Sequence, residues 1–519
     1  MGYDISDYTD IEPRYGTLAE VDNLIAELKK RGMKLVMDLV VNHTSNEHAW
    51  FLDSRSSKTS AKRDWYIWKP AKYDADGKRH PPNNWDQLLG EMNSAWTWDE
   101  ETQEYYLSLF TPEQPDINWE NPAVRAAVHD VLRFWLDRGV SGFRMDVINL
   151  ISKVQSFPDG EVVVPDHEYQ PGFKFFANGP RLHEFLKDMN REVLSKYDTI
   201  TVGEMPFVRD EEEILRTVRP SEKELNMIFI FEMVDIDTTP GRSRLSFEKW
   251  SPRSIRDCND HWQRLMTEKD GWNSLFIENH DNPRSVSRYV SDKPSDRVSG
   301  AKLLALMQTT LSGTLYVFQG EELGMTNFPL SWEPSEYLDI ESQNYWTKMN
   351  RMYPNNEDGM LDYARKILQM KARDHSRTPV HWTAGPNAGF CKDGVRPWMR
   401  INDNYTEINA EIQLEDKNSV LAFWRNQLQL RKEFKNVFVY GNFELVGADY
   451  EVIFAYRRWS ESDAWLVVLN FSGATVYWEI PHDVRVKEWV TSSGGDLNAK
   501  PLSGDLELVA WEGLLGRLT

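Results

Sequence analysis

Cysteine is scarce in this chain of 519 residues, in which only Cys258 and Cys391 occur. Two cysteines cannot supply the disulfide framework of a small secreted domain, and they are compatible with a reducing compartment. The first residues contain no basic segment followed by an apolar stretch, so the sequence shows no signal peptide. We therefore expect a cytoplasmic protein.

Long apolar runs and a basic surplus are also missing. No run of about 18 apolar residues occurs, which excludes a membrane span and a membrane partner. The 60 Lys and Arg are outnumbered by 81 Asp and Glu, and the formal net charge is −21. Because binding to a phosphate backbone requires a basic surface, we expect no nucleic-acid partner. The chain is rich in aromatics, with 21 Trp, 20 Tyr and 23 Phe.

Helices followed by short apolar strands recur along much of the chain. Thr17 to Glu20 has the pattern of a capping box, a helical apolar stripe follows it, and residues 34–41 then form an apolar run typical of a buried strand. Asn121-Pro122 has the pattern of a second helix start, with the end of that helix near Gly139. Further strands are predicted near residues 140–147, 199–203, 227–231, 273–277 and 314–318. This alternation predicts an α/β fold, a (β/α)₈ TIM barrel of which six strands are visible.

Two stretches depart from the barrel pattern. Residues 44–118 are too long for an ordinary loop and are rich in Trp, Asn, Pro and charge, which predicts an inserted subdomain. From residue 436 onward apolar residues alternate with period two, which predicts an antiparallel β-sandwich over 436–519. We predict that the remaining residues, 1–43 and 119–435, form the barrel domain.

Polar residues cluster where four of the predicted strands end, the edge at which barrel enzymes place their active sites. The four segments are Asp38-Leu-Val-Val-Asn42-His43, Gly142-Phe-Arg144-Met-Asp146-Val147, Val202-Gly-Glu204 and Phe276-Ile-Glu-Asn-His280-Asp281. Arg144 and Asp146 are two residues apart on a strand, so their side chains face the same side. Each residue alone is more often a cap, an ion-pair partner or a structural histidine, and the ordered set carries the prediction.

The cluster suits acid–base and nucleophilic chemistry. Arg144 favours the ionised form of Asp146, and an ionised carboxylate can act as a nucleophile. Glu204 on the next strand could deliver a proton to a leaving oxygen if its surroundings raise its pKa. Two carboxyl groups about 5 Å apart would suit a retaining glycosidase.

With these motifs the sequence resembles the α-amylase family of glycoside hydrolases, glycoside hydrolase family 13. The segments DLVVNH, GFRMDV, TVGE and IENHD match the four signature regions of the family in order. Gln114-Pro-Asp116-Ile-Asn118 resembles the fifth region in the form typical of the oligo-1,6-glucosidase group. The resemblance covers nearly the whole chain and implies a barrel with its subdomain inserted after the third strand of the family.

The resemblance also implies roles for individual residues. Asp146 is expected to be the nucleophile, Glu204 the general acid/base and Asp281 a third carboxylate that holds sugar hydroxyls. Asp38, Asn42 and Asp116 are expected to be scaffold. The residues expected to bind the non-reducing glucose are Tyr3, His43, Phe110, Gln114, Arg144, His280 and Arg377, the last preferred over Arg373.

Two further expectations rest on the resemblance. Val147, which follows the nucleophile, accompanies cleavage of α-1,6 bonds in similar enzymes, whereas Thr or Ala accompanies α-1,4 cleavage. Met1 matches a point just after the second barrel strand, so the first two strands and a calcium-binding loop would precede it. We therefore expect no cofactor and assign no metal site. A chain without those strands is expected to fold poorly, because an open barrel exposes strand edges.

The leading hypothesis is a retaining exo-acting α-glucosidase, a monomer or homodimer that cleaves α-1,6-linked glucose from small oligosaccharides. An α-1,4-acting maltase or sucrose hydrolase, a transglucosylase and a sucrose isomerase remain open as alternatives. Residues 232–247 lack the Arg-Leu-Asp-Arg-Asp motif of sucrose isomerases, which disfavours the last. A non-catalytic barrel remnant, or a protein like the transporter-associated glycoproteins, is the third hypothesis.

Overall fold

The computed structural model describes residues 2–90, 93–165, 167–239 and 243–519. The chain forms two compact units, Met1–Phe231 and Glu232–Thr519, and each is described by itself.

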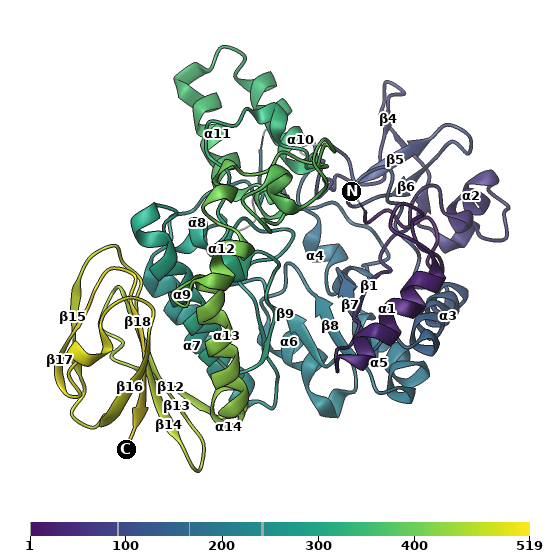
Figure 1. The fold of residues 1–519 in the computed structure, drawn as a ribbon. Helices are drawn as coiled ribbons and strands as arrows, with labels where there is room; N and C mark the ends of the chain where they lie inside the picture. The colour runs from purple at the N-terminus through teal and green to yellow at the C-terminus, as the bar shows by residue number, and fades with distance from the viewer. Residues whose placement is uncertain (1, 91–92, 166, 240–242) are drawn as a thin grey trace. The chain divides into compact units, whose positions relative to one another are not determined.

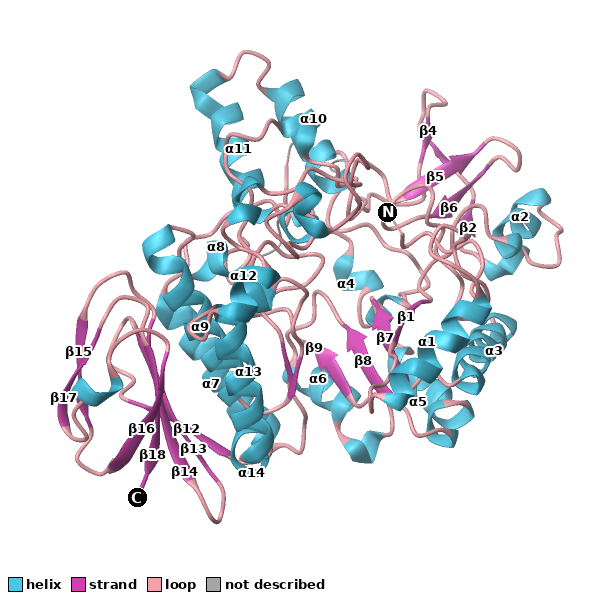
Figure 2. Cartoon of the chain, in the orientation of Figure 1, coloured by secondary structure: helices cyan, strands magenta, loops and turns pink. Residues whose placement is uncertain are grey.

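A four-stranded parallel sheet is the centre of the first unit. Its strand order is β1-β7-β8-β9, and the four strands lie side by side in Figure 2. The strands are β1 (Met37–Val40), β7 (Gly142–Asp146), β8 (Ile200–Glu204) and β9 (Met227–Phe229). The helices of this unit are α1 (Leu18–Lys30), α2 (Ala49–Ser56), α3 (Pro122–Arg138), α4 (Phe173–Phe176), α5 (Leu182–Glu192) and α6 (Glu211–Val218) (Figure 1).

Local signals in the sequence set the ends of these helices. Thr17 and Glu20 form the predicted capping box of α1. Asn121 caps α3, whose first residue is Pro122, and Gly139 ends it in the left-handed region with φ 103°. These predictions are confirmed. The strands are shorter than predicted; β1, for example, begins at Met37 rather than at residue 34.

Two glycines let the strands of this sheet pack closely. A Cβ atom on Gly142 would lie 2.0 Å from the backbone oxygen of Ile200 on the neighbouring strand. A Cβ on Gly203 would lie 2.7 Å from Leu225 and 2.9 Å from Ile148. Both separations are well inside van der Waals contact, so these glycines fix the spacing of the strands that carry Arg144, Asp146 and Glu204.

The region predicted as an insertion contains short antiparallel strands. They are β2 (Trp68–Lys69), β3 (Lys72–Tyr73), β4 (Arg79–His80), β5 (Trp96–Asp99) and β6 (Glu104–Leu107). Its apolar core, with Trp85 and Trp96, also includes Val147, Phe157 and Phe176 from the segment after β7. The insertion and the end of strand β7 therefore share one core, while the domain limits given above stay a prediction.

The second unit combines helices with a C-terminal sheet. Strands β10 (Ser274–Leu275) and β11 (Thr314–Leu315) are parallel and lie where strands were predicted. Its helices are α7 (Pro252–Glu268), α8 (Ser285–Tyr289), α9 (Pro294–Thr310), α10 (Ile340–Met352), α11 (Met360–Lys371), α12 (Ala410–Glu415), α13 (Val420–Glu433) and α14 (Lys435–Phe438). The C-terminal strands are β12 (Asn442–Val446), β13 (Ile453–Trp459), β14 (Ala464–Asn470), β15 (Val476–Ile480), β16 (Val486–Ser492), β17 (Gly504–Leu508) and β18 (Gly513–Leu518).

The C-terminal sheet is more deeply buried than its sequence pattern predicts. Period-two alternation is typical of strands with one buried face, but β14 is buried on both faces. One face packs on Trp478 and its neighbours inside the sandwich. The other packs on helices of the same unit, where the Tyr456 hydroxyl lies 2.6 Å from Thr310 Oγ1 and Trp465 contacts Phe434.

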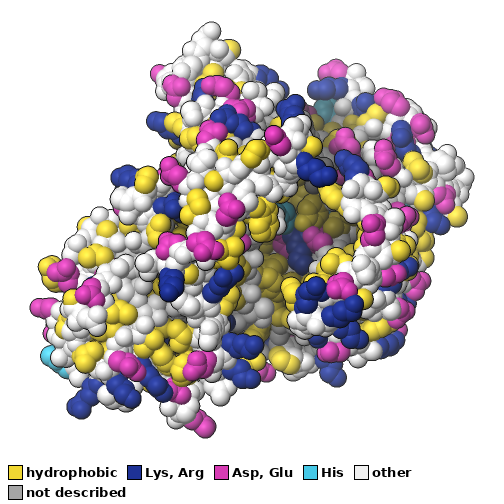
Figure 3. Space-filling view, in the orientation of Figure 1, with side chains coloured by type: hydrophobic (Ala, Val, Ile, Leu, Met, Phe, Trp, Pro, Cys, Tyr) yellow, Lys and Arg dark blue, Asp and Glu magenta, His cyan; other side chains and the backbone are white. Residues whose placement is uncertain are grey.

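The surface mixes charges of both signs. On the face drawn in Figure 3, Lys and Arg side chains are interspersed with Asp and Glu despite the net charge of −21. Within the described residues, no helix combines the length and the apolar character needed to cross a membrane.

Candidate active site

Arg144 is the centre of a group of carboxylates in the first unit. Its Nη1 lies 2.6 Å from Asp146 Oδ1 and 2.9 Å from Asp38 Oδ1, and its Nη2 lies 2.6 Å from Glu204 Oε2. The parallel register explains the group, because Asp38 pairs with Arg144 across β1 and β7, and β8 ends at Glu204 on the other side of β7. The structure thus brings Asp146 and Glu204 onto one guanidinium, as the sequence predicted for Arg144 and Asp146.

The pKa of Asp146 differs from the expectation. We expected Arg144 to hold this carboxyl ionised, but burial raises its pKa to about 6 and outweighs the lowering by Arg144. The negative charge of Asp38, which contacts the same guanidinium, raises it further. Asp146 is therefore mostly ionised at pH 7 and titrates just below it.

Val147 has an unusual backbone. It lies directly after β7 with φ 35° and ψ 43°, in the left-handed region that β-branched residues rarely adopt. Its side chain is buried in the core of the insertion, and its N–H donates to Glu204 Oε2 at 3.2 Å. The sequence predicted a role for the Val147 side chain, and the structure adds a contact between its backbone and Glu204.

The predicted sugar-binding residues of the first unit lie in contact with one another. The Tyr3 hydroxyl donates to Asp38 at 2.8 Å, and its ring lies 5.7 Å from the Arg144 guanidinium. His43 Nε2 lies 3.0 Å from the Tyr3 carbonyl oxygen, and its ring is 5.1 Å from Phe110. Gln114 Nε2 lies 3.1 Å from His43 Nε2.

Sequence reasoning missed Lys153 in this unit. This side chain is buried behind His43 and forms an ion pair with Asp116 at 3.0 Å. A lysine in the apolar segment after the nucleophile strand was the available signal, but its partners, Asn42 and Asp116, lie 111 and 37 residues earlier in the chain.

Asp281 lies in a second cluster, which belongs to the second unit. Arg377 Nη2 contacts Asp281 Oδ1 at 2.9 Å, Arg373 Nη1 contacts the same oxygen at 3.4 Å, and His280 Nε2 lies 3.3 Å from Asp281 Oδ2. Burial raises the pKa of Asp281, but Arg373, His280, Arg244 and Arg377 lower it more, so the net pKa is well below its usual range. Asp281 is thus ionised at neutral pH, and unlike Asp146 it does not titrate near neutrality.

The two candidate arginines both face Asp281, and Arg377 is the closer. Arg377 also donates to the His280 carbonyl oxygen at 2.9 Å and contacts Asp339 at 2.6 Å. Sequence reasoning missed Asp339, which anchors Arg377, and Arg244, which donates to the Asp281 carbonyl oxygen. No recognised motif contains either residue.

Metal ligands do not gather in the described ranges. There, no group of three or more His, Cys, Asp or Glu is arranged to hold a metal ion. The expectation of an enzyme without a cofactor stays a prediction.

The comparison with protein families decides the identity of the fold. The family described as "Alpha amylase, catalytic domain" matches residues 1–441. The chain belongs to the α-amylase family. Members of this family act on glycosidic bonds, and its curated relatives make this chain an enzyme, a glycoside hydrolase. The hypothesis of a non-catalytic protein is therefore set aside.

Relatives with assigned functions cover almost all of this α-amylase-family chain. An α-glucosidase of Schizosaccharomyces pombe is 49% identical over 93% of this chain and 82% of its own length. An oligo-1,6-glucosidase of Parageobacillus thermoglucosidasius is 45% identical over 98% of this chain and 88% of its own. An isomaltulose synthase mutant of Erwinia rhapontici NX5, crystallised with sucrose, is 35% identical in sequence. Its structure matches this one with a TM-score of 0.91 over 100% of this chain and 89% of that chain. These similarities confirm the predicted fold class.

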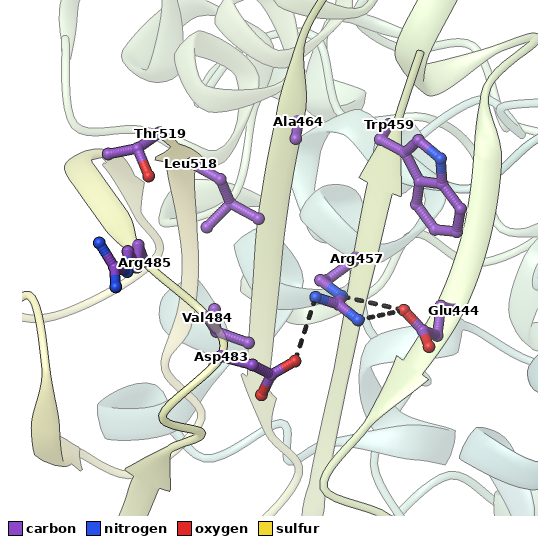
Figure 4. A pocket seen from close by; sticks show the side chains of 9 residues that line it. All are labelled: Glu444, Arg457, Trp459, Ala464, Asp483, Val484, Arg485, Leu518 and Thr519. Atoms are coloured by element: carbon purple, nitrogen blue, oxygen red, sulfur yellow. Dashed lines mark hydrogen bonds and ion pairs between the residues drawn. The ribbon is translucent and has the colours of Figure 1, made fainter. Parts of the chain in front are cut away.

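A separate hollow of about 440 Å³ lies on the C-terminal sheet (Figure 4). Arg457 projects into it between Glu444 and Asp483, with Nε 2.9 Å from Glu444 Oε2. None of the predicted site residues lines this hollow.

Proposed function

We propose that this chain is a retaining exo-acting α-glucosidase that cleaves terminal α-1,6-linked glucose from small oligosaccharides. The observation that carries the proposal is the contact of Asp146 and Glu204 with one half-buried arginine. The names of two relatives, an α-glucosidase and an oligo-1,6-glucosidase, support the substrate class.

The proposed first step uses the two carboxyl groups, of Asp146 and Glu204, that contact Arg144. Asp146, ionised above pH 6, attacks the anomeric carbon of the terminal glucose, and the glycosidic bond breaks as Glu204 protonates the leaving oxygen. Glu204 Oε2 accepts both the Val147 N–H and an Arg144 N–H, so the transferred proton is carried by Oε1. The product is a glucosyl ester on Asp146.

The proposed second step reverses these roles. Glu204, now ionised, takes a proton from water, and the water oxygen displaces Asp146 from the anomeric carbon. Two inversions leave the released glucose in the α configuration. Asp281, held ionised by its arginines, would accept hydrogen bonds from sugar hydroxyls. The other residues proposed to bind glucose are Tyr3, His43, Phe110 and Gln114 of the first unit and His280 and Arg377 of the second.

Competing disaccharides test the linkage preference. We expect kcat/KM for isomaltose to exceed that for maltose, and we expect Val147→Thr, which keeps the volume and the branched Cβ, to shift the ratio toward maltose. Faster hydrolysis of maltose by the unaltered chain would contradict the α-1,6 preference. It would favour an α-1,4-acting maltase.

A sucrose isomerase is the second candidate, because the isomaltulose synthase described above shares the fold. The segment 232–247, of which residues 240–242 lie outside the described structure, lacks the motif expected of that activity. On sucrose we therefore expect glucose and fructose if the bond is cleaved at all. Isomaltulose or trehalulose as the main product would overturn the assignment as a hydrolase.

For the compartment we keep the proposal of a cytoplasmic enzyme, supported by two cysteines that are both free thiols. We likewise keep the proposal of a monomer or homodimer.

A further inference from the structure

A buried ion pair lies behind His43. The Lys153 side chain is 1% exposed and that of Asp116 is 0% exposed, and their charged atoms are 3.0 Å apart. Lys153 Nζ also donates to Asn42 Oδ1 at 3.0 Å and to the Leu150 carbonyl oxygen at 2.6 Å. Burying two charges costs free energy that their attraction only partly offsets.

The ion pair fixes the orientation of the Asn42 amide. Asn42 Nδ2 donates to Asp116 Oδ1 at 2.9 Å, and Asn42 Oδ1 accepts from the Lys153 ammonium. A turned amide would place its oxygen against the carboxylate and its NH₂ group against the ammonium, so only one orientation is allowed. In that orientation Nδ2 also lies 3.2 Å from His43 Nδ1.

The orientation of Asn42 determines the tautomer of His43. Because Nδ1 accepts from an amide NH₂ group, the ring proton is on Nε2. Nε2–H then donates to the Tyr3 carbonyl oxygen at 3.0 Å. Gln114 Nε2 donates to the same oxygen at 3.3 Å. Gln114 Nε2 and His43 Nε2, which lie 3.1 Å apart, are therefore two donors that share one acceptor.

The ring is also held neutral. Burial lowers the pKa of His43 to about 4, and Lys153 lowers it too, against the opposite effect of Asp116 and Asp4. The aromatic ring of Phe110 packs on the imidazole. His43 therefore keeps one proton, on Nε2, from pH 5 upward.

We propose that Lys153 is a positioning residue, which through Asp116 and Asn42 holds His43 as the Nε2–H tautomer so that its outer nitrogen can only donate a hydrogen bond. The tautomer follows from the contacts of the free protein alone. In the free protein the acceptor of Nε2–H is the Tyr3 carbonyl oxygen. That a sugar hydroxyl replaces this acceptor when substrate binds rests on the proposed function.

A charge-balanced double substitution, Lys153→Met with Asp116→Asn, should reverse the tautomer. The Leu109 N–H donates to Asp116 Oδ2 at 2.9 Å, so in the variant it selects the amide oxygen of the new side chain and turns the NH₂ group toward Asn42. Asn42 must then turn so that its oxygen accepts from this NH₂ group. The same turn places the Asn42 oxygen, instead of its NH₂ group, against His43 Nδ1, which favours a proton on Nδ1.

The matched control is Lys500→Met with Glu512→Gln. This pair is also buried, with side chains 7% and 0% exposed and 2.7 Å apart, but it lies in segments that flank strands β17 and β18. Both double variants remove one ion pair and leave the net charge unchanged, so they separate a loss of stability from an effect on His43.

The measurement is ¹⁵N NMR of protein labelled at its 11 histidines, with the His43 signals assigned by their loss in His43→Gln. We expect a protonated Nε2 and an unprotonated Nδ1 in the unaltered protein and in the control. In the Lys153/Asp116 variant we expect the Nδ1–H form to appear, with KM for a nitrophenyl α-glucoside raised roughly 10-fold and kcat changed by less than about 3-fold.

Several outcomes would overturn the inference. Nδ1–H in the unaltered protein would refute it even if no variant folds. An unchanged tautomer in a folded Lys153/Asp116 variant would refute the role of Lys153, and a changed tautomer with unchanged KM would refute the role of Nε2 as a donor to sugar. If the tautomers behave as expected but the unaltered protein cleaves no α-glucoside, the proposed function fails and the positioning role of Lys153 stands.

Discussion

At the scale of single residues, two of the predicted carboxylates differ in the charges that surround them. Asp146 shares one arginine with two other carboxylates, whereas several cations surround Asp281. Their pKa values therefore move in opposite directions, and Asp146 is the group that titrates near neutral pH.

The first prediction is an acid limb in the pH dependence of activity. Because Asp146 must be ionised to attack and its pKa is about 6, kcat/KM should fall tenfold per pH unit below that value. Initial rates at substrate concentrations well below KM between pH 4.5 and 8 measure it. A profile that stays flat down to pH 4.5 would contradict this account of Asp146.

The second prediction concerns Asp146→Asn. We expect kcat to fall by at least about 10⁴-fold, while the protein becomes no less stable at pH 7.5. The sign follows from the raised pKa: folding disfavours the ionised form, so the charge of Asp146 has a cost in stability that grows as the pH rises above 3.8 and reaches its full value above pH 6. Thermal unfolding measures the change.

Asp237 is the matched control for that substitution. Burial raises its pKa, but Arg288 and Lys371 lower it more, to about 2. The charge of Asp237 therefore stabilises the folded protein at pH values above the unfolded pKa, and this stabilisation is lost as the pH falls toward 2. Asp237→Asn should destabilise the protein by about 2–3 kcal/mol at pH 7.5, and a similar loss from Asp146→Asn would contradict the distinction.

At the scale of elements, strand β13 carries two neighbouring arginines with opposite surroundings. Arg458 is buried and donates to the carbonyl oxygens of Val437 and Gly441, at 2.8 and 2.9 Å. Arg457 points into the hollow of Figure 4, where its side chain is 28% exposed and pairs with Glu444.

The third prediction follows from this contrast. Arg458→Met should cost about 2–4 kcal/mol, because it leaves several buried acceptors without a donor. Arg457→Met should cost less than about 1 kcal/mol, as is usual for an exposed ion pair. Urea unfolding of both variants tests the difference, and equal losses would show that β13 is not buried as described.

The ends of elements were the easiest features to predict. Thr17, Asn121 and Gly139 act through neighbours in sequence, and each of them has its predicted place. Val147 shows the limit, since nothing local in GFRMDV announces a left-handed valine. Its side chain packs in the core of the insertion, with residues far away in the chain.

At the scale of the whole molecule, the sequence was sufficient for the fold class and insufficient for long-range electrostatics. Alternating helices and strands predicted the barrel strands, and four short motifs predicted the carboxylates. The raised pKa of Asp146 depends on its burial and on the nearby charge of Asp38, and the role of Lys153 depends on partners far away in the chain. Spacing along the sequence contains neither quantity.

The most direct test of the central claim is the configuration of the glucose released first. Proton NMR of 4-nitrophenyl α-glucopyranoside during the first minutes of hydrolysis distinguishes the two anomers before they interconvert. A nucleophilic Asp146 predicts α-glucose first, with β-glucose appearing only by mutarotation. Release of β-glucose first would show a single displacement by water and contradict the account.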